Sequence, residues 1–241
     1  EAGGDIDLTN VSQTSGGDAG TIVVTTEDGT ITVLSTGTGV TTAGTGTIDL
    51  DANSTGSDAD VVVDEVVTST TGTITIDAAD TIWNTAVISA TGAGVIDLNA
   101  ADNVDQDADI TSVGGNITVD ADTTDINMAD GTTTDSGAGT IAYTAETDVD
   151  ISILDSDSTV DVTATTGEIT DNLSAGTEDA NIFGTTVTLS AATGIGSSDD
   201  IDTNITTLDA TNSGSGNIQI NEVEAGGDID LTNVSQTSGG D

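Results

Sequence analysis

The sequence predicts an all-β fold of one kind, a β-solenoid: a parallel β-helix, expected to be right-handed, with about 22 residues and three short strands in each turn. Three observations lead to this prediction. A short signature recurs five times between residues 46 and 147, apolar and polar residues alternate around it, and bulky aromatic residues are almost absent. A single turn of such short strands cannot bury its own apolar face, but stacked turns bury a continuous column.

The signature reads Gly, any residue, Ile, any residue, an apolar residue, then Asp, Asn or Thr, then Ala. Its copies begin at Gly46 (GTIDLDA), Gly72 (GTITIDA), Gly94 (GVIDLNA), Gly115 (GNITVDA) and Gly139 (GTIAYTA). The spacing between successive copies is too short for separate domains and too regular for chance. We therefore interpret each copy as the same strand in successive turns.

Alternation within the signature predicts which side chains face the interior. The inward positions are Ile48, Leu50, Ile74, Ile76, Ile96, Leu98, Ile117, Val119 and Ile141, and the outward ones are Asp49, Thr75, Asp97 and Thr118. After the Ala, two copies continue with shorter alternating runs, around Ile82 and Ile88 in one and around Val104 and Ile110 in the next. The Gly, Asn and Asp residues between the runs are typical of turns, which gives three strands per turn.

The composition favours a thin interior. The chain has 1% aromatic residues, no Pro and 30 Gly, whereas a β-sandwich core normally contains bulky fillers. A β-helix can be filled by Ile, Val, Leu and Ala alone. Disorder is the other interpretation of so many Thr, Ser, Gly and Asp residues, but 34% hydrophobic content with strand periodicity argues against it.

The charge balance is extreme, because 43 acidic residues are accompanied by no Lys, Arg or His. No salt bridge between side chains can form within such a chain, and nucleic acid and anionic membrane surfaces are excluded as partners. No apolar run approaches the length of a membrane span, so no membrane insertion is expected. Cysteine is absent, which rules out disulfides and thiolate metal sites.

The two ends of the sequence are the same, since residues 1–18 and residues 224–241 both read EAGGDIDLTNVSQTSGGD. We interpret residues 1–223 as one period of a longer tandem array and residues 224–241 as the start of the next. The whole of residues 1–241 is then one continuous β-helical segment. Its partners are expected to be further copies of itself, stacked end to end, with GDIDL at Gly227 restoring the register in which the chain began.

Outside the five copies the pattern is less regular. GTIVV at Gly20 and GTITV at Gly29 are close enough to be two strands of one turn, and the facing of the run Val61–Val63 cannot be assigned from the sequence. After Gly139 the strand-like segments are unevenly spaced, which predicts loops that bulge from the solenoid.

Two segments carry the full repeat: GTITIDAADTIWNTAVISA (residues 72–90) and GVIDLNAADNVDQDADITS (residues 94–112). They resemble the haemagglutinin-type β-helix repeats of large secreted adhesins, the filamentous-haemagglutinin family. The resemblance covers residues 46–147 well and the remainder loosely. It implies a long extracellular stalk or filament with adhesive ends, although this chain lacks the basic residues that binding of heparin-like or other anionic glycans would need.

Clustered carboxylates are candidate ligands for Ca²⁺, the one cofactor that the sequence indicates. The candidate metal ligands are Asp105, Asp107 and Asp109, expected to alternate along one strand; Asp199, Asp200 and Asp202, in a turn-like stretch; and Asp51, Asp77 and Asp120, stacked with Asn99 in one column. The alternative is a solvated acidic face, because neither an EF-hand loop nor the nonapeptide of calcium-binding β-rolls is present. Condensed cations are expected as partners in either case.

Three large side chains have predicted places. Trp83 should point outward, since its neighbour Ile82 is inward, and is a candidate for lateral packing or sugar stacking unless a loop covers it. Met128 and Tyr143 fall at inward positions and should belong to the core.

These observations predict a structural protein: a stalk or filament segment of a giant repetitive surface protein, end-stacked into a polyanionic, cation-stabilised fibre that could also bundle laterally. A secreted or cell-surface location is expected, and five N-x-[ST] sequons, the first at Asn10, are compatible with it. A Ca²⁺-dependent glycan- or surface-binding adhesin module is the alternative function. An enzyme of the β-helical polysaccharide-degrading type is a weaker one, because no cationic side chain can stabilise an oxyanion or hold an acidic sugar.

Overall fold

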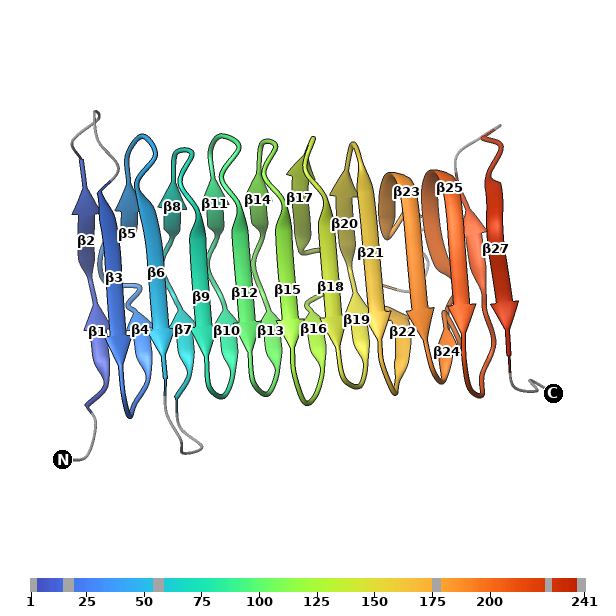
Figure 1. Cartoon of the computed structure of the whole chain (residues 1–241), viewed down its shortest axis with the longest axis horizontal. Coiled ribbons are helices and arrows are strands. Elements are labelled where there is room, and N and C mark those ends of the chain that lie inside the picture. Colours follow the sequence, from blue (N-terminus) through green and yellow to red (C-terminus); the bar gives the residue numbers. More distant parts are fainter. Residues whose placement is uncertain (1–3, 15–19, 54–58, 175–178, 224–226, 238–241) are drawn as a thin grey trace.

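The chain forms a single stack of β-strand coils, as a computed structural model shows (Figure 1). The residues that it describes are 4–14, 20–53, 59–174, 179–223 and 227–237. About ten turns follow one another along one axis, with three strands in each turn. The first strand, β1 (Ile6–Leu8), and the last, β27 (Asp230–Gln236), lie at opposite ends. The predicted β-solenoid is therefore confirmed.

Each turn passes through three columns of parallel strands, named here columns A, B and C. Column A is the nine-stranded sheet β1, β4 (Ile31–Val33), β7 (Val61–Val63), β10 (Ile82–Asn84), β13 (Val104–Gln106), β16 (Ile126–Met128), β19 (Val149–Ile151), β22 (Glu168–Asp171) and β24 (Gly194–Ile195). Column B contains β2 (Asn10–Gln13), β5 (Gly39–Thr42), β8 (Val67–Ser69), β11 (Ile88–Ala90), β14 (Ile110–Ser112), β17 (Thr133–Gly137), β20 (Ile153–Ser156) and β26 (Ile220–Glu222). Column C contains β3 (Thr21–Thr26), β6 (Thr47–Ala52), β9 (Ile74–Ala78), β12 (Ile96–Ala100), β15 (Ile117–Ala121), β18 (Ile141–Ala145), β21 (Thr159–Ala164) and β27. The long strands β23 (Ile182–Ala191) and β25 (Ile201–Asn212) run through B and then C, so these two columns make one sheet.

The five signatures all lie in column C, one above another and in register. Ile96, for example, is aligned with Ile74 of the turn before it and with Ile117 of the turn after it. All nine residues predicted to face inward are buried, and the four predicted to face outward are half-exposed. Met128 and Tyr143 are core residues, as predicted. Val61 and Val63 are buried with Val62 between them facing outward, which assigns the run left open by the sequence.

The signature glycines are required because successive backbones approach each other closely at that point. A Cβ atom added to Gly72, Gly94, Gly115 or Gly139 would overlap the carbonyl oxygen of the signature glycine in the preceding turn. No larger residue fits without moving two backbones apart. The same carbonyls accept hydrogen bonds from buried hydroxyls at the end of column B, as from Ser69 Oγ to the Gly72 oxygen at 2.6 Å. Sequence reasoning missed this serine and threonine column.

Three hydrogen-bonded polar side chains form a group within the interior of the central turns. The Tyr143 hydroxyl lies 2.7 Å from Thr134 Oγ1 and also donates to Gln106 Oε1, while Gln106 Nε2 donates to Thr134 at 3.0 Å. All three side chains are buried, and their polar atoms satisfy one another across the three columns. Burial raises the pKa of the Tyr143 phenol far above its usual value, so it stays protonated.

The irregular spacing after Gly139 leaves the inward positions of column C aligned, although the register shifts between β17 and β20 and between β25 and β27. Ile141 is aligned with Val160, Val160 with Val187, and Val187 with Leu208, so the inward column continues to residue 208. The variation in spacing is absorbed between strands. One such connection includes residues 175–178, which lie outside the described residues, so the loop prediction is not settled there.

The repeated ends take two different places, and the predicted return to the starting register is wrong. At the start, Ile6–Leu8 is in column A beside β4 and Asn10–Gln13 is in column B beside β5. At the end, the same letters form the single strand β27 in column C, beside β25. Gly20 and Gly29 introduce β3 and β4, two successive strands of the coil, as predicted.

Candidate functional site

The first predicted group of metal ligands does not follow one strand. Asp105 is in β13, which ends at Gln106, while Asp107 and Asp109 lie in the connection to column B. Asp109 Oδ1 accepts a hydrogen bond from the Thr133 backbone N–H of the next turn at 2.9 Å. Asp105 and Asp107 line one groove on the outer face of column A, so only these two of the three share a site.

The second group is split between the surface and the sheet. Asp199 is exposed, whereas Asp202 is buried in β25 and accepts a hydrogen bond from Asn221 Nδ2 at 2.7 Å. Asp199 and Asp200 are instead close to Asp171. Burial is the main cause that raises the pKa of Asp171; hydrogen bonds from the Leu173 N–H and the Asn181 amide lower it, and the two neighbouring carboxylates raise it further.

The third group does form a column on the outer face of column C. Asp51 is aligned with Asp77, Asp77 with Asn99, and Asn99 with Asp120. Asn99 therefore separates Asp120 from the other two carboxylates, and Asp51 and Asp77 are the one direct pair. The pKa of Asp77 is raised by burial first, lowered by a hydrogen bond from Asn99, and raised again by Asp51, Asp97 and Asp49.

Similar causes act on Asp51 and Asp120. Burial is the largest cause, and it raises both pKa values. Repulsion from Asp49 raises the pKa of Asp51 further, and repulsion from Asp122 and Asp97 raises that of Asp120 further. In both cases partial desolvation contributes more than like-charge repulsion.

The ladders keep carboxylates apart. Along the outer face of column C, Asp49, Thr75, Asp97 and Thr118 are successive neighbours, so Asp97 lies between two Thr residues and Asp49 has a Thr on one side. In the ladders of the described residues two acidic residues are directly aligned at two places only, Asp51 with Asp77 and Asp135 with Asp155. The pKa of Asp155 is likewise raised, by burial and then by Asp135 and Asp157.

Neutral donors take the role that cations would have in another protein. Asn127 Nδ2 donates to Asp105 Oδ1 at 2.9 Å, Asn233 Nδ2 donates to Asp209 Oδ1 at 2.9 Å, and the Thr170 hydroxyl donates to Asp150, each from the following turn. Backbone N–H groups of the next turn do the same, as from Glu168 to Asp148 at 2.8 Å. A hydrogen bond to a charged group is worth about 1.5–3 kcal/mol, which offsets the missing ion pairs.

Among the described residues, no three carboxylates converge in an arrangement that could hold a metal ion. The same part of the chain has no helix of the length and apolarity that crossing a bilayer requires. The acidic side chains of the described residues are distributed among Thr and Asn along the ladders and do not form one closed ligand set.

Trp83 points outward, as predicted, and no loop among the described residues covers it, since it is 45% exposed. It lies in β10 between Val62 of the turn before and Asp105 of the turn after. With Asp64, Thr85 and Asp107 these residues line a groove of about 410 Å³.

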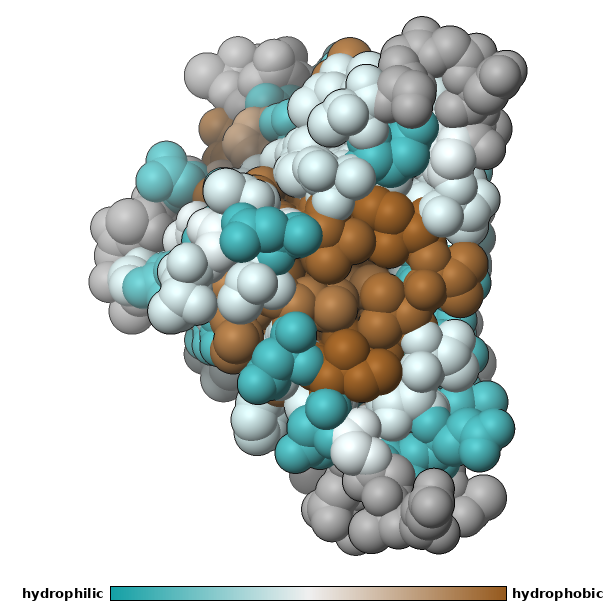
Figure 2. Space-filling model, turned by 90° about the vertical axis from the view of Figure 1, so that its left-hand side faces the viewer, coloured by the Kyte–Doolittle hydropathy of each residue, from teal (hydrophilic) through white to brown (hydrophobic). Residues whose placement is uncertain are grey.

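Both ends of the solenoid expose apolar residues. Figure 2 shows hydrophobic residues gathered at the centre of the N-terminal end, with hydrophilic residues around them. Ile6, Ile22 and Val24 are only partly buried there, while Val23, aligned with Asp49 on the outer face of column C, is 58% exposed. The open edges of β1, β2 and β3 surround this patch.

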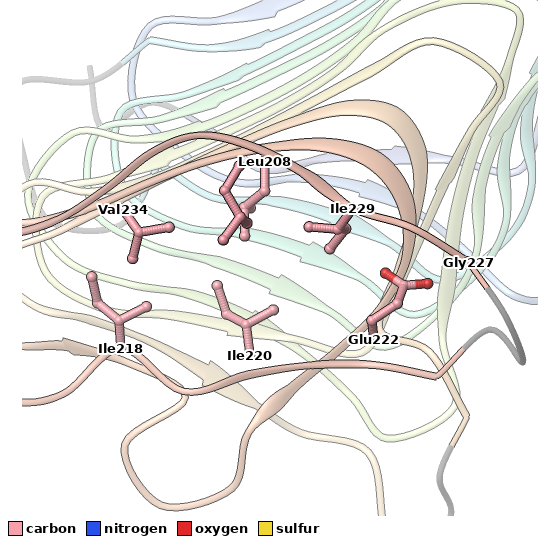
Figure 3. A pocket seen from close by; sticks show the side chains of 8 residues that line it. Leu208, Ile218, Ile220, Glu222, Gly227, Ile229 and Val234 are labelled. Carbon is pink, nitrogen blue, oxygen red and sulfur yellow. The ribbon is translucent and has the colours of Figure 1, made fainter.

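The C-terminal end has a cavity of about 350 Å³ between its last strands. Ile218 and Ile220 face Ile229 and Val234 across it, and Glu222 lies at its margin (Figure 3). One Glu222 carboxylate oxygen accepts from Thr203 at 3.1 Å; the other is buried with no hydrogen-bond partner among the described residues. Leu231 and Val234 are 61% and 50% exposed, so the last turn is covered less well than any central one.

Sequence reasoning missed how the carboxylates are satisfied. The signal was available, because Thr and Asn recur one turn away from many of the outward Asp residues, but it becomes visible only when the turns are aligned. No protein-family model, curated protein or solved structure matches the chain.

Proposed function

We propose that this chain is a structural segment of a long, repetitive extracellular protein, in which successive periods stack end to end into one stiff polyanionic shaft. The observation that carries the proposal is the pair of open ends. Each end exposes the apolar interior together with the unpaired edges of its last strands, and an identical sequence begins and ends the chain. An exposed strand edge beside an apolar patch favours addition of further parallel strands.

The outer wall supports a structural role. It consists of short ladders of Asp, Thr and Asn that satisfy one another from turn to turn, with 43 acidic residues over a rod about 48 Å long, taking about ten turns at about 4.8 Å each. Such a surface repels other copies sideways and condenses cations. Divalent ions such as Ca²⁺ would act at the two directly aligned Asp pairs, with neutral donors serving elsewhere. The haemagglutinin-type adhesins that the repeats resemble are the class of surface protein we assign it to.

The proposal is tested by the shape of a chain that contains two consecutive periods. Small-angle scattering and negative-stain images should show one straight rod of about twice the length of the single period and the same cross-section, because the ladder continues through the junction. Two short rods joined at a variable angle would contradict it. The single period is the control, and it should associate end to end as its concentration rises.

A further inference from the structure

The groove around Trp83 places an exposed aromatic ring among carboxylates on the outer wall. Trp83 is the only tryptophan of the chain, and the sheet surface beside it is otherwise composed mainly of small polar and acidic residues. Val62 provides an apolar neighbour on one side of the ring, and Asp105 a carboxylate on the other. A large aromatic ring left 45% exposed has a cost in water that a covered position would avoid.

The carboxylates that flank the ring are held in place. Asp64 Oδ1 accepts a hydrogen bond from the Thr85 hydroxyl at 2.7 Å, and Asp105 Oδ1 accepts one from Asn127 Nδ2 at 2.9 Å. Both donors are neutral, so they orient the carboxylates without cancelling their charge. Asp107 adds a third carboxylate at the margin of the same groove.

We propose that this groove binds a cationic side chain, the ammonium of a lysine or the guanidinium of an arginine, presented by a basic polypeptide. The face of a Trp ring attracts such a cation, and the carboxylates beside it supply the opposite charge. A second copy of this chain cannot be the ligand, because it has no Lys, Arg or His. The partner is therefore a different molecule, attracted toward the wall by its net charge of −43 and positioned by the groove.

Charge distinguishes this ligand from a neutral sugar, which could also stack on an aromatic ring. A sugar gains nothing from the net negative potential, and three carboxylates in a groove are more than its hydroxyls need. A cation uses every one of these features at once.

Because Trp83 is the chain's one tryptophan, tryptophan fluorescence reports on this groove. Hexalysine and hexaarginine peptides, added at physiological ionic strength, should change the fluorescence of Trp83 in a saturable manner, and neutral maltotetraose should not. The absence of a peptide effect would overturn the proposal. A response to maltotetraose alone would assign the groove to sugars and overturn it equally.

Two variants with the same net charge separate the groove from the general polyanion. Asp105→Asn/Asp107→Asn removes two of the groove's three carboxylate charges, and Asp97→Asn/Asp120→Asn removes two charges from column C; both change the net charge from −43 to −41. The first should weaken peptide binding about tenfold and the second less than about twofold. Equal weakening in the two variants would show attraction by net charge only and would overturn the site.

Variants that replace Trp83 lack its fluorescence, so their affinity for the peptides is measured by calorimetry. Trp83→Phe should keep part of the binding and Trp83→Ala should lose it, because a smaller aromatic face still attracts a cation. Unchanged affinity in Trp83→Ala would contradict a role for the ring. Circular dichroism confirms for each variant that the solenoid is retained.

Discussion

Residues 4–13 and residues 227–236 have the same sequence, GDIDLTNVSQ, but lie in different columns of the solenoid. The first copy makes two short strands, in columns A and B, and the second makes one continuous strand in column C. Neither the apolar residues nor their alternation changes between the two. The column that a strand joins is therefore decided by the edges available beside it and not by its own sequence.

The central turns behave in the opposite way. Between Gly46 and Ala145 each signature has a turn on both sides, and the close approach of successive glycine backbones fixes its column and register. An end strand has a neighbour on one side only. The centre of the solenoid is therefore fixed and its ends are adaptable, and adaptable ends are what joining of successive periods requires.

Chain length indicates what happens to the second copy when another period follows. If β27 stayed in column C, the next inward residue of that column would be the second period's counterpart of Ile22. The number of residues from Leu231 to that counterpart equals the number from Leu8 to Ile22. A turn of that length would be shorter than the turn from Ile141 to Val160, and no complete turn in the described ladders is shorter than the turn from Ile141 to Val160. Residues 227–236 must then move to columns A and B, where the identical residues 4–13 lie at the N-terminal end.

The largest expected difference between centre and end comes from a buried charge. Ile96→Asp should prevent folding, at a cost of at least about 3–5 kcal/mol, because no cationic side chain can compensate the carboxylate. Leu231→Asp, at the exposed end, should change the free energy of unfolding by less than about 0.5 kcal/mol. Chemical denaturation of both variants checks this, and equal losses would mean that the ends are as constrained as the centre.

The next effect concerns the glycine column. Gly115→Ala places a Cβ against the Gly94 carbonyl and should cost about 1–3 kcal/mol. Its neighbour is the matched control: in Gly114→Ala the new Cβ meets only other Cβ atoms at 3.8 Å and beyond, so stability should change by less than about 1 kcal/mol. Thermal melting of the two variants decides, and a tolerated Gly115→Ala would remove the glycine explanation for the fixed register.

A smaller effect is expected for the buried polar group. Tyr143→Phe leaves Gln106 and Thr134 without their shared hydroxyl and should cost about 1–2 kcal/mol. At the C-terminal end, Gln236→Ala removes an amide oxygen that accepts a hydrogen bond from Asn212 Nδ2 at 2.9 Å. Because this hydrogen bond is partly exposed, its loss should lower the free energy of unfolding by less than about 0.5 kcal/mol. A harmless Tyr143→Phe would show that the interior group is not needed to hold the three columns together.

The smallest effect is the pH dependence of the aligned Asp pair. Since the folded pKa values of Asp51 and Asp77 are raised above those of the unfolded chain, the folded state binds protons more tightly, and stability is lost as pH rises through the folded pKa. Asp77→Asn should gain a few tenths of a kcal/mol at pH 7, since screening limits a half-exposed pair, and should reduce this slope. Asp161→Asn, between Ala142 and Thr188, is the control with equal charge. Melting curves from about pH 4 to pH 7, with and without Ca²⁺, provide the comparison; a slope that is the same in both variants would contradict the role of the pair.

Much of the centre could be predicted from the sequence, because the regular period and strict alternation assign Ile74, Ile96 and Ile117 to one inward column. The register of the ends could not, since GDIDLTNVSQ fits two columns equally well. The carboxylate ladders were only partly predictable. The column containing Asp77 and Asn99 follows from the repeat, as does the alignment of Trp83 with Asp105, but the separation of Asp107 from the strand of Asp105 depends on where β13 ends and the chain turns.

The account rests on the repeated segment changing columns at a junction, and cysteine pairs test this most directly because the chain has no cysteine of its own. In the single period, Asp209→Cys/Asn233→Cys should form a disulfide, since these positions are aligned neighbours in column C. In a chain of two periods the same pair should fail to cross-link, and Asp230→Cys should instead cross-link to Thr32→Cys of the second period, as the aligned pair Asp7 and Thr32 predicts. Cross-linking of the first pair in both chains, with none of the second, would contradict the account.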